Sequence, residues 1–260
     1  MYKAFTASEL KGHFNLPPDY KIKGYISYGA YDNEKHFNNI KKVLKELKLK
    51  YTSRNLGKVY GFLSHILEIK IKGNIYWFSV NYGSARLSEY LHLACLFGSK
   101  KNIHIGSFGG LYPEMDSLEL LLPTWSFSQE TSALSYNREA KDFKHYPDKN
   151  LFNLIKSKIP KQYKIWEGPI ITNQAMLGET LEDVKKWSED GYYGVEMETA
   201  TVFAVSAHFK MPSASVLYNT DNLIKGQTVG DQTHTQQKMQ REEVKKDVYK
   251  IALEIVLNNS

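Results

Sequence analysis

Apolar and polar residues recur along this chain with two different periods, which predict an alternation of strands and helices. Residues 34–48 place apolar side chains every three to four positions, the spacing of one helical face. Residues 58–81 instead contain two apolar runs around the turn at 72–74, which predicts a half-buried hairpin. The same patterns predict strands over 23–29, 102–106, 117–127, 163–173 and 213–219, a short strand entering Glu196, and helices over 84–97, 180–190, 197–209 and 238–257.

Strands that alternate with helices favour an α/β class of fold, here a single-domain α/β/α layer fold with a mixed central sheet. A chain of 260 residues is long enough for one core, and α/β folds of this size are commonly one domain. We therefore expect residues 1–22 to form an N-terminal extension and residues 23–260 to form the domain. Ligands of such folds bind at the carboxyl ends of the strands.

Composition and charge argue against several classes of function. The formal net charge is +6, but the lysines fall mostly on polar helix faces, so we expect solvated surface and no nucleic-acid partner. No apolar run reaches the roughly 20 residues of a membrane span, and the N-terminus lacks a secretory apolar region. With Cys95 as the one cysteine, these features predict a cytoplasmic protein without a membrane partner. The scattered histidines predict no metal site.

A glycine-rich segment follows the predicted strand 102–106. Residues 106–110 (GSFGG) could form a tight turn whose glycines supply positive φ. Alternatively, their backbone N–H groups and the Ser107 hydroxyl could cradle an anion or a hydroxyl-rich ligand.

Two acidic motifs follow later in the chain. Glu196 and Glu198 flank Met197 where an apolar helix begins, so they could simply complement the helix dipole, with Met197 in the core. Asp221 ends an apolar run and could cap a turn with Asn222. Acidic groups that enter a buried region are costly unless something binds them, which favours a polar ligand with hydroxyl groups.

Taken together, these motifs resemble those of the nucleoside phosphorylase/uridine phosphorylase superfamily, which includes purine nucleoside phosphorylases and methylthioadenosine nucleosidases. The ordered resemblance runs from about residue 23 to residue 257. It rests on GSFGGL after a strand, VEMETA at a helix start, TDN 22 to 24 residues beyond Glu198, and KIALEIVL near the C-terminus. The resemblance implies an enzyme that cleaves the N-ribosidic bond of purine nucleosides.

The resemblance also implies roles for individual residues. Asp221 matches the acid that protonates purine N7, and Arg241 matches an arginine that assists it. Glu198 matches the carboxylate that grips the ribose hydroxyls, Met197 packs on the ribose, and Glu196 lies at the edge of the same pocket. Each role suits the chemistry, since a desolvated carboxylic acid can protonate a leaving group and a carboxylate binds hydroxyls strongly.

Further residues are assigned to the base and to the nucleophile. Met176 falls where a base-stacking aromatic residue often lies, and Asn222 follows the acid in the substrate pocket. The phosphate or water site would be formed by Ser107, Gly106, His104 and Gly29.

The chain departs from the phosphorolytic members at two phosphate-binding arginines. Residues 29–34 read GAYDNE where those members carry Gly-Asp-Pro-x-Arg, and His104 replaces an arginine. GAYDNE resembles the nucleosidases, in which the last glutamate, here Glu34, activates a water. A further arginine of those nucleosidases corresponds to Leu217 here.

We favour phosphorolysis, with inorganic phosphate as co-substrate and no other cofactor. A hydrolytic nucleosidase is the alternative, and a catalytically inactive nucleoside-binding or storage relative is the second alternative. The presence of both Glu198 and Asp221 argues against the inactive relative. Family members assemble as dimers to hexamers, so we expect a homo-oligomer.

Overall fold

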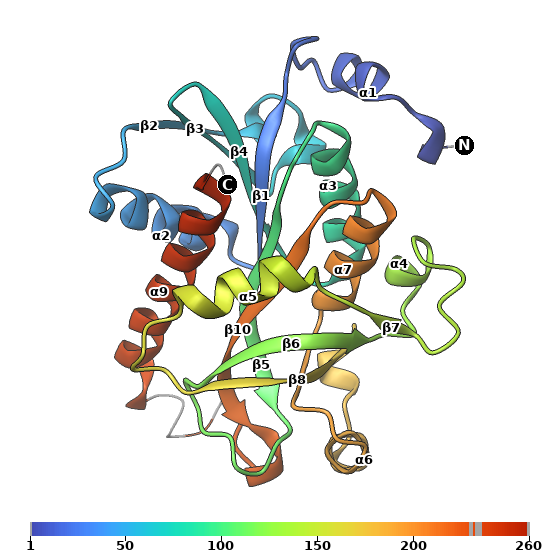
Figure 1. Ribbon diagram of the computed structural model, residues 1–260, viewed down its shortest axis with the longest axis vertical. Coiled ribbons are helices and arrows are strands. Elements are labelled where there is room, and N and C mark those ends of the chain that lie inside the picture. The colour runs from blue at the N-terminus through green and yellow to red at the C-terminus, as the bar shows by residue number, and fades with distance from the viewer. Residues whose placement is uncertain (1, 229–230, 232–235, 259–260) are drawn as a thin grey trace.

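The computed structural model describes residues 2–228, 231 and 236–258, and its centre is one mixed β-sheet (Figure 1). Over these residues the sheet has ten strands. The strands are β1 (Ile22–Gly29), β2 (Tyr51–Asn55), β3 (Ile66–Ile71), β4 (Asn74–Asn81), β5 (Asn102–Gly110), β6 (Leu120–Phe127), β7 (Lys144–His145), β8 (Ile165–Thr172), β9 (Gly194–Glu196) and β10 (Ser213–Asn222).

The order of the strands explains how distant segments meet. Neighbours follow the order β10-β6-β8-β9-β5-β1-β4-β3-β2, and β7 pairs with β6. β5 also pairs with β10 in parallel, so β5, β9, β8, β6 and β10 form a closed ring of strands. The long strand β5 therefore borders β1, β9 and β10, and residues near its end lie beside the ends of all three.

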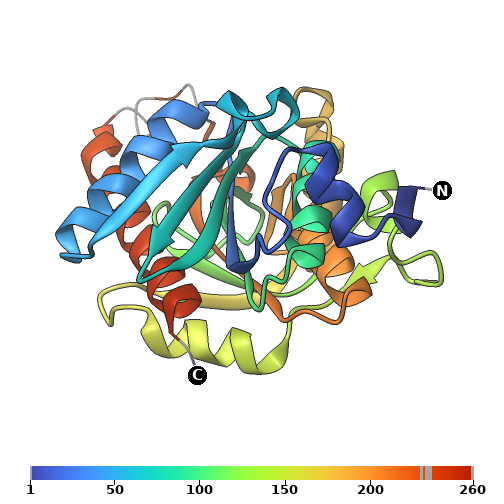
Figure 2. The same cartoon turned by 90° about the horizontal axis from the view of Figure 1, so that it is seen from above.

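Helices cover both faces of the sheet, which confirms the predicted α/β layer fold (Figure 2). One apolar core joins the sheet to α2, α5 and α9, and a second joins it to α1, α3 and α7. Within the described part of the chain the helices are α1 (Ala7–His13), α2 (Asn33–Glu46), α3 (Ser84–Leu96), α4 (Thr131–Leu134), α5 (Lys149–Lys158), α6 (Leu181–Glu189), α7 (Thr199–His208) and α9 (Lys238–Leu257).

The N-terminal segment packs against the layer that contains α3. Phe14, Leu16 and Tyr20 are buried in the same core as the apolar side of α3. The Tyr20 hydroxyl also accepts a hydrogen bond from the indole N–H of Trp77, at 2.7 Å. The domain boundary after residue 22 stays a prediction, and the predicted end at residue 260 lies outside the described residues.

The glycine-rich segment 106–110 is part of β5 and not a loop after it, so the predicted end of this strand at residue 106 is wrong. Positive φ occurs at five described glycines, and none of them lies in this segment, so the tight-turn interpretation is also wrong. Close packing explains Gly109, because a Cβ there would approach Leu223 Cδ1 to 2.8 Å. Similarly, a Cβ at Gly110 would approach Asn219 Nδ2 to 2.9 Å.

Five elements that the apolar pattern did not predict are α1, β2, α4, β7 and α5. Among the described strands β2 pairs with β3 alone, and none of its residues is buried, so its sequence carries little apolar periodicity. In the described ranges, no helix combines the length and the hydropathy that a bilayer span requires.

Candidate active site

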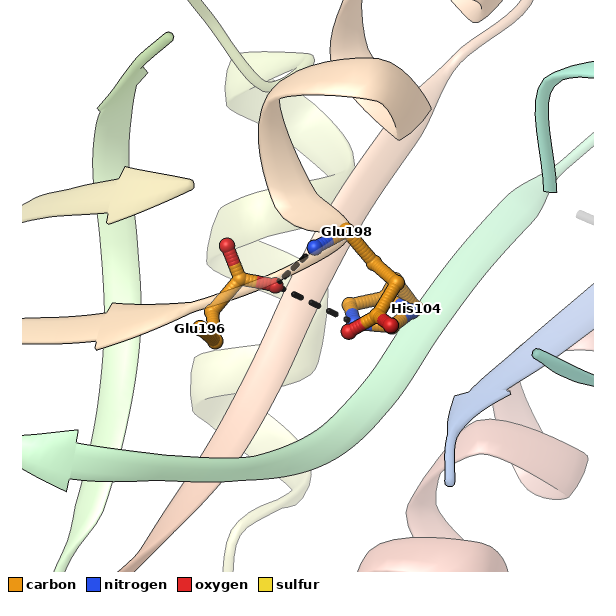
Figure 3. Close-up of side chains that lie close together, drawn as sticks. All are labelled: His104, Glu196 and Glu198. Carbon is orange, nitrogen blue, oxygen red and sulfur yellow. Dashed lines mark hydrogen bonds and ion pairs between the residues drawn. The ribbon is translucent and has the colours of Figure 1, made fainter. Parts of the chain in front are cut away.

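Three buried ionisable side chains meet where β5, β9 and α7 converge (Figure 3). His104 comes from β5, Glu196 ends β9, and Glu198 immediately precedes α7. These three residues are 1%, 5% and 5% exposed. Buried charges of this kind require partners, and the partners differ sharply between the two glutamates.

Glu196 caps the start of α7. Its Oε2 accepts hydrogen bonds from the backbone N–H groups of Glu198 at 2.7 Å and Thr199 at 2.8 Å. Its Oε1 accepts a third from the Thr172 hydroxyl at 2.6 Å. The prediction of a helix-start acid is therefore confirmed for Glu196, whose charge faces the positive end of the helix dipole.

Glu198 turns away from the helix and toward the end of β1. Its Oε1 accepts the backbone N–H of Gly83 at 2.5 Å. A Cβ at Gly29 would approach Glu198 Oε2 to 2.6 Å, so the glycine is required for the carboxylate to lie there. Burial, and then the nearby charge of Glu196, raise the pKa of Glu198 to about 8, against the lowering effect of backbone N–H groups.

His104 lies beside both carboxylates. Its Nδ1 shares a hydrogen bond with the Ser27 hydroxyl at 2.9 Å, and its Nε2 lies 3.7 Å from Glu196 Oε2. His104, Glu196 and Glu198 each offer an atom that could bind a metal, all within 4.8 Å of one another. The three hydrogen bonds on Glu196 suit a helix cap better than a metal ligand. Sequence spacing could not reveal this group, because β5 and β9 are far apart in the chain.

Asp221 reaches the same end of the sheet through strand register. It lies opposite Gly109 of β5, which in turn lies opposite Val195 of β9, directly before Glu196. The β10 register shifts between Asn219 and Asp221, an irregularity of the kind that often re-aims a side chain next to an active site. Asp221 is 5% exposed, so it is a buried carboxyl group as expected.

Arg241 and Ser107 are brought together around Tyr218. Tyr218 lies opposite Ser107 in the β10–β5 pairing. Burial raises the pKa of Tyr218 to about 12, while its hydrogen bonds to the Tyr28 and Ser107 hydroxyls and the charge of Arg241 act to lower it. Arg241 lies in α9 and is 6% exposed. The predicted arginine and the predicted nucleophile-site serine thus share one neighbourhood, which includes a tyrosine pair that the sequence did not indicate.

Asn222 is engaged within the protein. Its Nδ2 donates to the carbonyl oxygens of Tyr112 and Met115, both at 2.8 Å, and its Oδ1 accepts the Lys225 N–H at 3.1 Å. These contacts agree with the turn-capping interpretation, for which Asn222 and not Asp221 supplies the oxygen. A contact between Asn222 and substrate stays a prediction.

The remaining predicted residues differ in how they are placed. Met197 lies beside Gly83, because a Cβ added to that glycine would be 3.8 Å from the Met197 methyl group. Gly106 lies against Gly29, because a Cβ added to Gly106 would be 3.4 Å from the backbone N of Gly29. Met176 begins η4 (Met176–Gly178) and is 44% exposed. Their roles toward a ligand stay predictions.

Glu34 lies apart from the buried cluster. It is exposed in the first turn of α2, where Asp32 caps the helix by accepting the Lys35 N–H at 3.0 Å. Among the described residues, no hydrogen bond or ion pair joins Glu34 to His104 or to the two buried glutamates. Its role as a base that activates water stays a prediction.

Comparison with known proteins assigns the chain to a family. The model of the phosphorylase superfamily matches residues 64–257. A DeoD-type purine nucleoside phosphorylase of Caldanaerobacter subterraneus is 25% identical over 66% of this chain and 72% of its own length. A guanosine phosphorylase of Halorubrum lacusprofundi is 25% identical over 51% of this chain, which spans only 55% of that protein.

A solved structure shows the same fold. A mutant of Helicobacter pylori MTAN with 5′-methylthioadenosine in its active site matches with a TM-score of 0.66 and 16% identity. The match covers 90% of this chain and 98% of the other. At this identity the likeness establishes the fold alone. Because the family model spans well over half of the sequence, the chain belongs to the phosphorylase superfamily.

Proposed function

We propose that this protein cleaves the N-ribosidic bond of purine nucleosides by phosphorolysis, releasing the free base and ribose 1-phosphate. The observation that carries the proposal is the buried Glu198 carboxyl group, held by the Gly83 N–H and accommodated by Gly29. The Gly83 N–H holds one oxygen of this group, and the missing side chain of Gly29 lets the other oxygen lie close to the end of β1. The superfamily and the names of the two phosphorylase relatives support the same activity.

The reaction assigns a separate task to each buried acid. Glu198 accepts hydrogen bonds from the ribose hydroxyls and so orients the sugar, which is a charge-assisted interaction once the carboxyl group is ionised. Asp221 donates a proton to the leaving purine as the C1′–N bond breaks. Glu196 lies at the edge of the same pocket, and its oxygens hold the start of α7 in place.

The nucleophile would approach from the side of Ser107. Gly106, Ser107 and His104 lie at this end of β5, and Arg241 is the nearby buried cation on α9. Arg241 is assigned to assist Asp221, and its guanidinium also places a positive charge near Tyr218 and Ser107, of a kind that suits recognition of phosphate oxygens. The exposed position of Glu34 gives less support to hydrolysis by a water that Glu34 activates.

Product analysis tests the proposal. We expect wild-type protein to release base from inosine or adenosine only when phosphate is present, with a rate that saturates with phosphate and ribose 1-phosphate as the sugar product. Free ribose at every phosphate concentration would overturn phosphorolysis in favour of the nucleosidase. In that case Glu34→Gln should abolish the turnover. Absence of base release from every purine nucleoside would instead favour the inactive nucleoside-binding relative.

We also propose that the protein is a cytoplasmic homo-oligomer that uses no cofactor besides phosphate. Two features support association with further copies. One is a groove of about 890 Å³ between α1, α3 and α4, which is lined in part by Phe62. The other is the exposure of large rings, those of Phe62, Tyr31 and Tyr82. The single cysteine Cys95 is buried and free, as is usual in a reducing compartment. Light scattering after size exclusion measures the assembly, and a monomer at micromolar concentration would contradict it.

A further inference from the structure

Gln174 connects three segments around the candidate site, although the sequence gave no indication of a role for it. It follows β8, and its Oε1 accepts the backbone N–H of Ser84 at 2.7 Å. Its Nε2 donates to the carbonyl oxygen of Met197 at 2.6 Å and to Ser84 Oγ at 2.9 Å. The Ser84 hydroxyl donates in turn to the same Met197 carbonyl oxygen at 2.7 Å.

These hydrogen bonds fix the residues on either side of the contact between Gly83 and Glu198. The Gly83 N–H binds the Glu198 carboxylate, and Gln174 fixes the residue after Gly83 and the residue before Glu198. Gly83 has a φ of 88°, a left-handed conformation that glycine adopts without strain. A Cβ there would approach Gln174 Oε1 to 2.9 Å, so the close approach of the amide also requires glycine.

We infer that Gln174 is a positioning residue that holds the Glu198 carboxyl group in the orientation that binds the ribose hydroxyls. This inference rests on the proposed function. The side-chain amide donates hydrogen bonds to Met197 and to Ser84 Oγ, and its oxygen accepts one from the Ser84 N–H. Three hydrogen bonds therefore fix the orientation of the Gln174 side chain. Gln174 touches no substrate in this role and acts only through Gly83, Ser84 and Met197.

Two substitutions separate positioning from a merely structural contribution. Gln174→Ala removes all three hydrogen bonds, and a misplacement of about 1 Å at a reacting group can cost ~10²-fold in rate. Gln174→Glu keeps the size but turns the donor toward Met197 into an acceptor. It also places a third carboxyl group near the Glu196–Glu198 pair, and a like charge raises the pKa of a carboxyl group.

Asn173 provides the matched control. It precedes Gln174 in the same segment, and its side-chain amide donates to Glu179 Oε1 at 3.1 Å. Asn173→Ala therefore removes an amide of the same chemistry from the same segment without removing a hydrogen bond to Ser84 or Met197. A loss of activity that reflects only a loosened segment should appear in both alanine variants.

The experiment combines inosine kinetics at saturating phosphate with titration of labelled glutamate carboxyl carbons by NMR. We expect Gln174→Ala to lose ~10²-fold in kcat/KM, Asn173→Ala to retain nearly wild-type values, and Gln174→Glu to raise the apparent pKa of Glu198. Equal losses in both alanine variants, or an unchanged Glu198 titration in folded Gln174→Glu, would overturn the inference. If wild type cleaves no purine nucleoside, the proposed function fails, and the Glu198 titration in Gln174→Ala then decides the inference: a shift absent from Asn173→Ala supports positioning, and identical titrations overturn it.

Discussion

Replacing Asp221 with asparagine is expected to lower purine nucleoside cleavage by about 10²–10⁴-fold while the protein stays folded. Asp221 is buried on β10 at the sheet end that carries Glu196 and Glu198. An amide of the same shape cannot supply a proton to the leaving base. Base release from inosine, measured at saturating phosphate, reports the loss.

Substrate chemistry provides a sharp control for this prediction. A 7-methylated purine nucleoside already carries a positive charge on its base, so its leaving group needs no proton at N7. Asp221→Asn should therefore cleave 7-methylinosine far better than inosine, relative to wild type. Asp116→Asn is the matched variant, since this acid is 71% exposed and pairs with Lys225 away from the cluster. Wild-type inosine cleavage by Asp221→Asn would show that another group is the acid.

Replacing Glu198 with glutamine is expected to lower kcat/KM for nucleosides by about 10- to 100-fold, the value of one or two hydrogen bonds to a charged group. Affinity for free base should barely change, because Glu198 is assigned to the sugar alone. The wild-type profile of kcat/KM should rise with pH toward about 8 as Glu198 ionises, since this parameter reports the free enzyme. The glutamine variant should lack this rising limb. Equal losses for nucleoside and free base would contradict the assignment.

The same substitution is expected to stabilise the protein at alkaline pH. The pKa of Glu198 is raised from 4.5 to about 8 on folding, so the native state binds the proton more tightly than the unfolded state does. The contribution of Glu198 to the free energy of unfolding is therefore complete below about pH 4.5, and it is lost as the pH rises through about 8. Glutamine removes that loss.

Thermal unfolding between pH 5 and 8 measures this difference. One pKa unit corresponds to 1.36 kcal/mol, so even part of the shift makes Glu198→Gln more stable by on the order of 2 kcal/mol at pH 8. That gain would raise Tm by about 4–8 °C for a domain of this size. Identical slopes of Tm against pH in wild type and variant would show that Glu198 is already ionised in the native state.

The chain by itself determined the features that depend on near neighbours in sequence. The last helix was predicted over 238–257, where α9 lies, and the turn at 72–74 joins β3 to β4 as expected. Gly98, with φ of 100°, lies two residues after the end of α3, where glycine commonly ends a helix. These features follow from apolar period, turn residues and capping, which act over a few residues.

Glu196 and Glu198 show which contacts can be predicted from neighbouring residues and which cannot. The sequence placed both near a helix start, and both are there. Only tertiary structure decided that Glu196 binds the N–H groups of α7 while Glu198 binds Gly83, more than 100 residues earlier in the chain. One contact is local and predictable from capping, and the other depends on how β4 and α3 lie against β9.

The remaining site features were decided by the packing of strands and not by any local pattern. Segment 106–110 continues as strand because β9 and β10 pair with it. His104 meets Glu196 because β5 and β9 are neighbours in the closed ring, and Gln174 acts on Glu198 through α3. The sequence could name the buried acids, since ionisable residues in apolar surroundings are rare. Their partners required the register between distant strands, which only the folded chain determines.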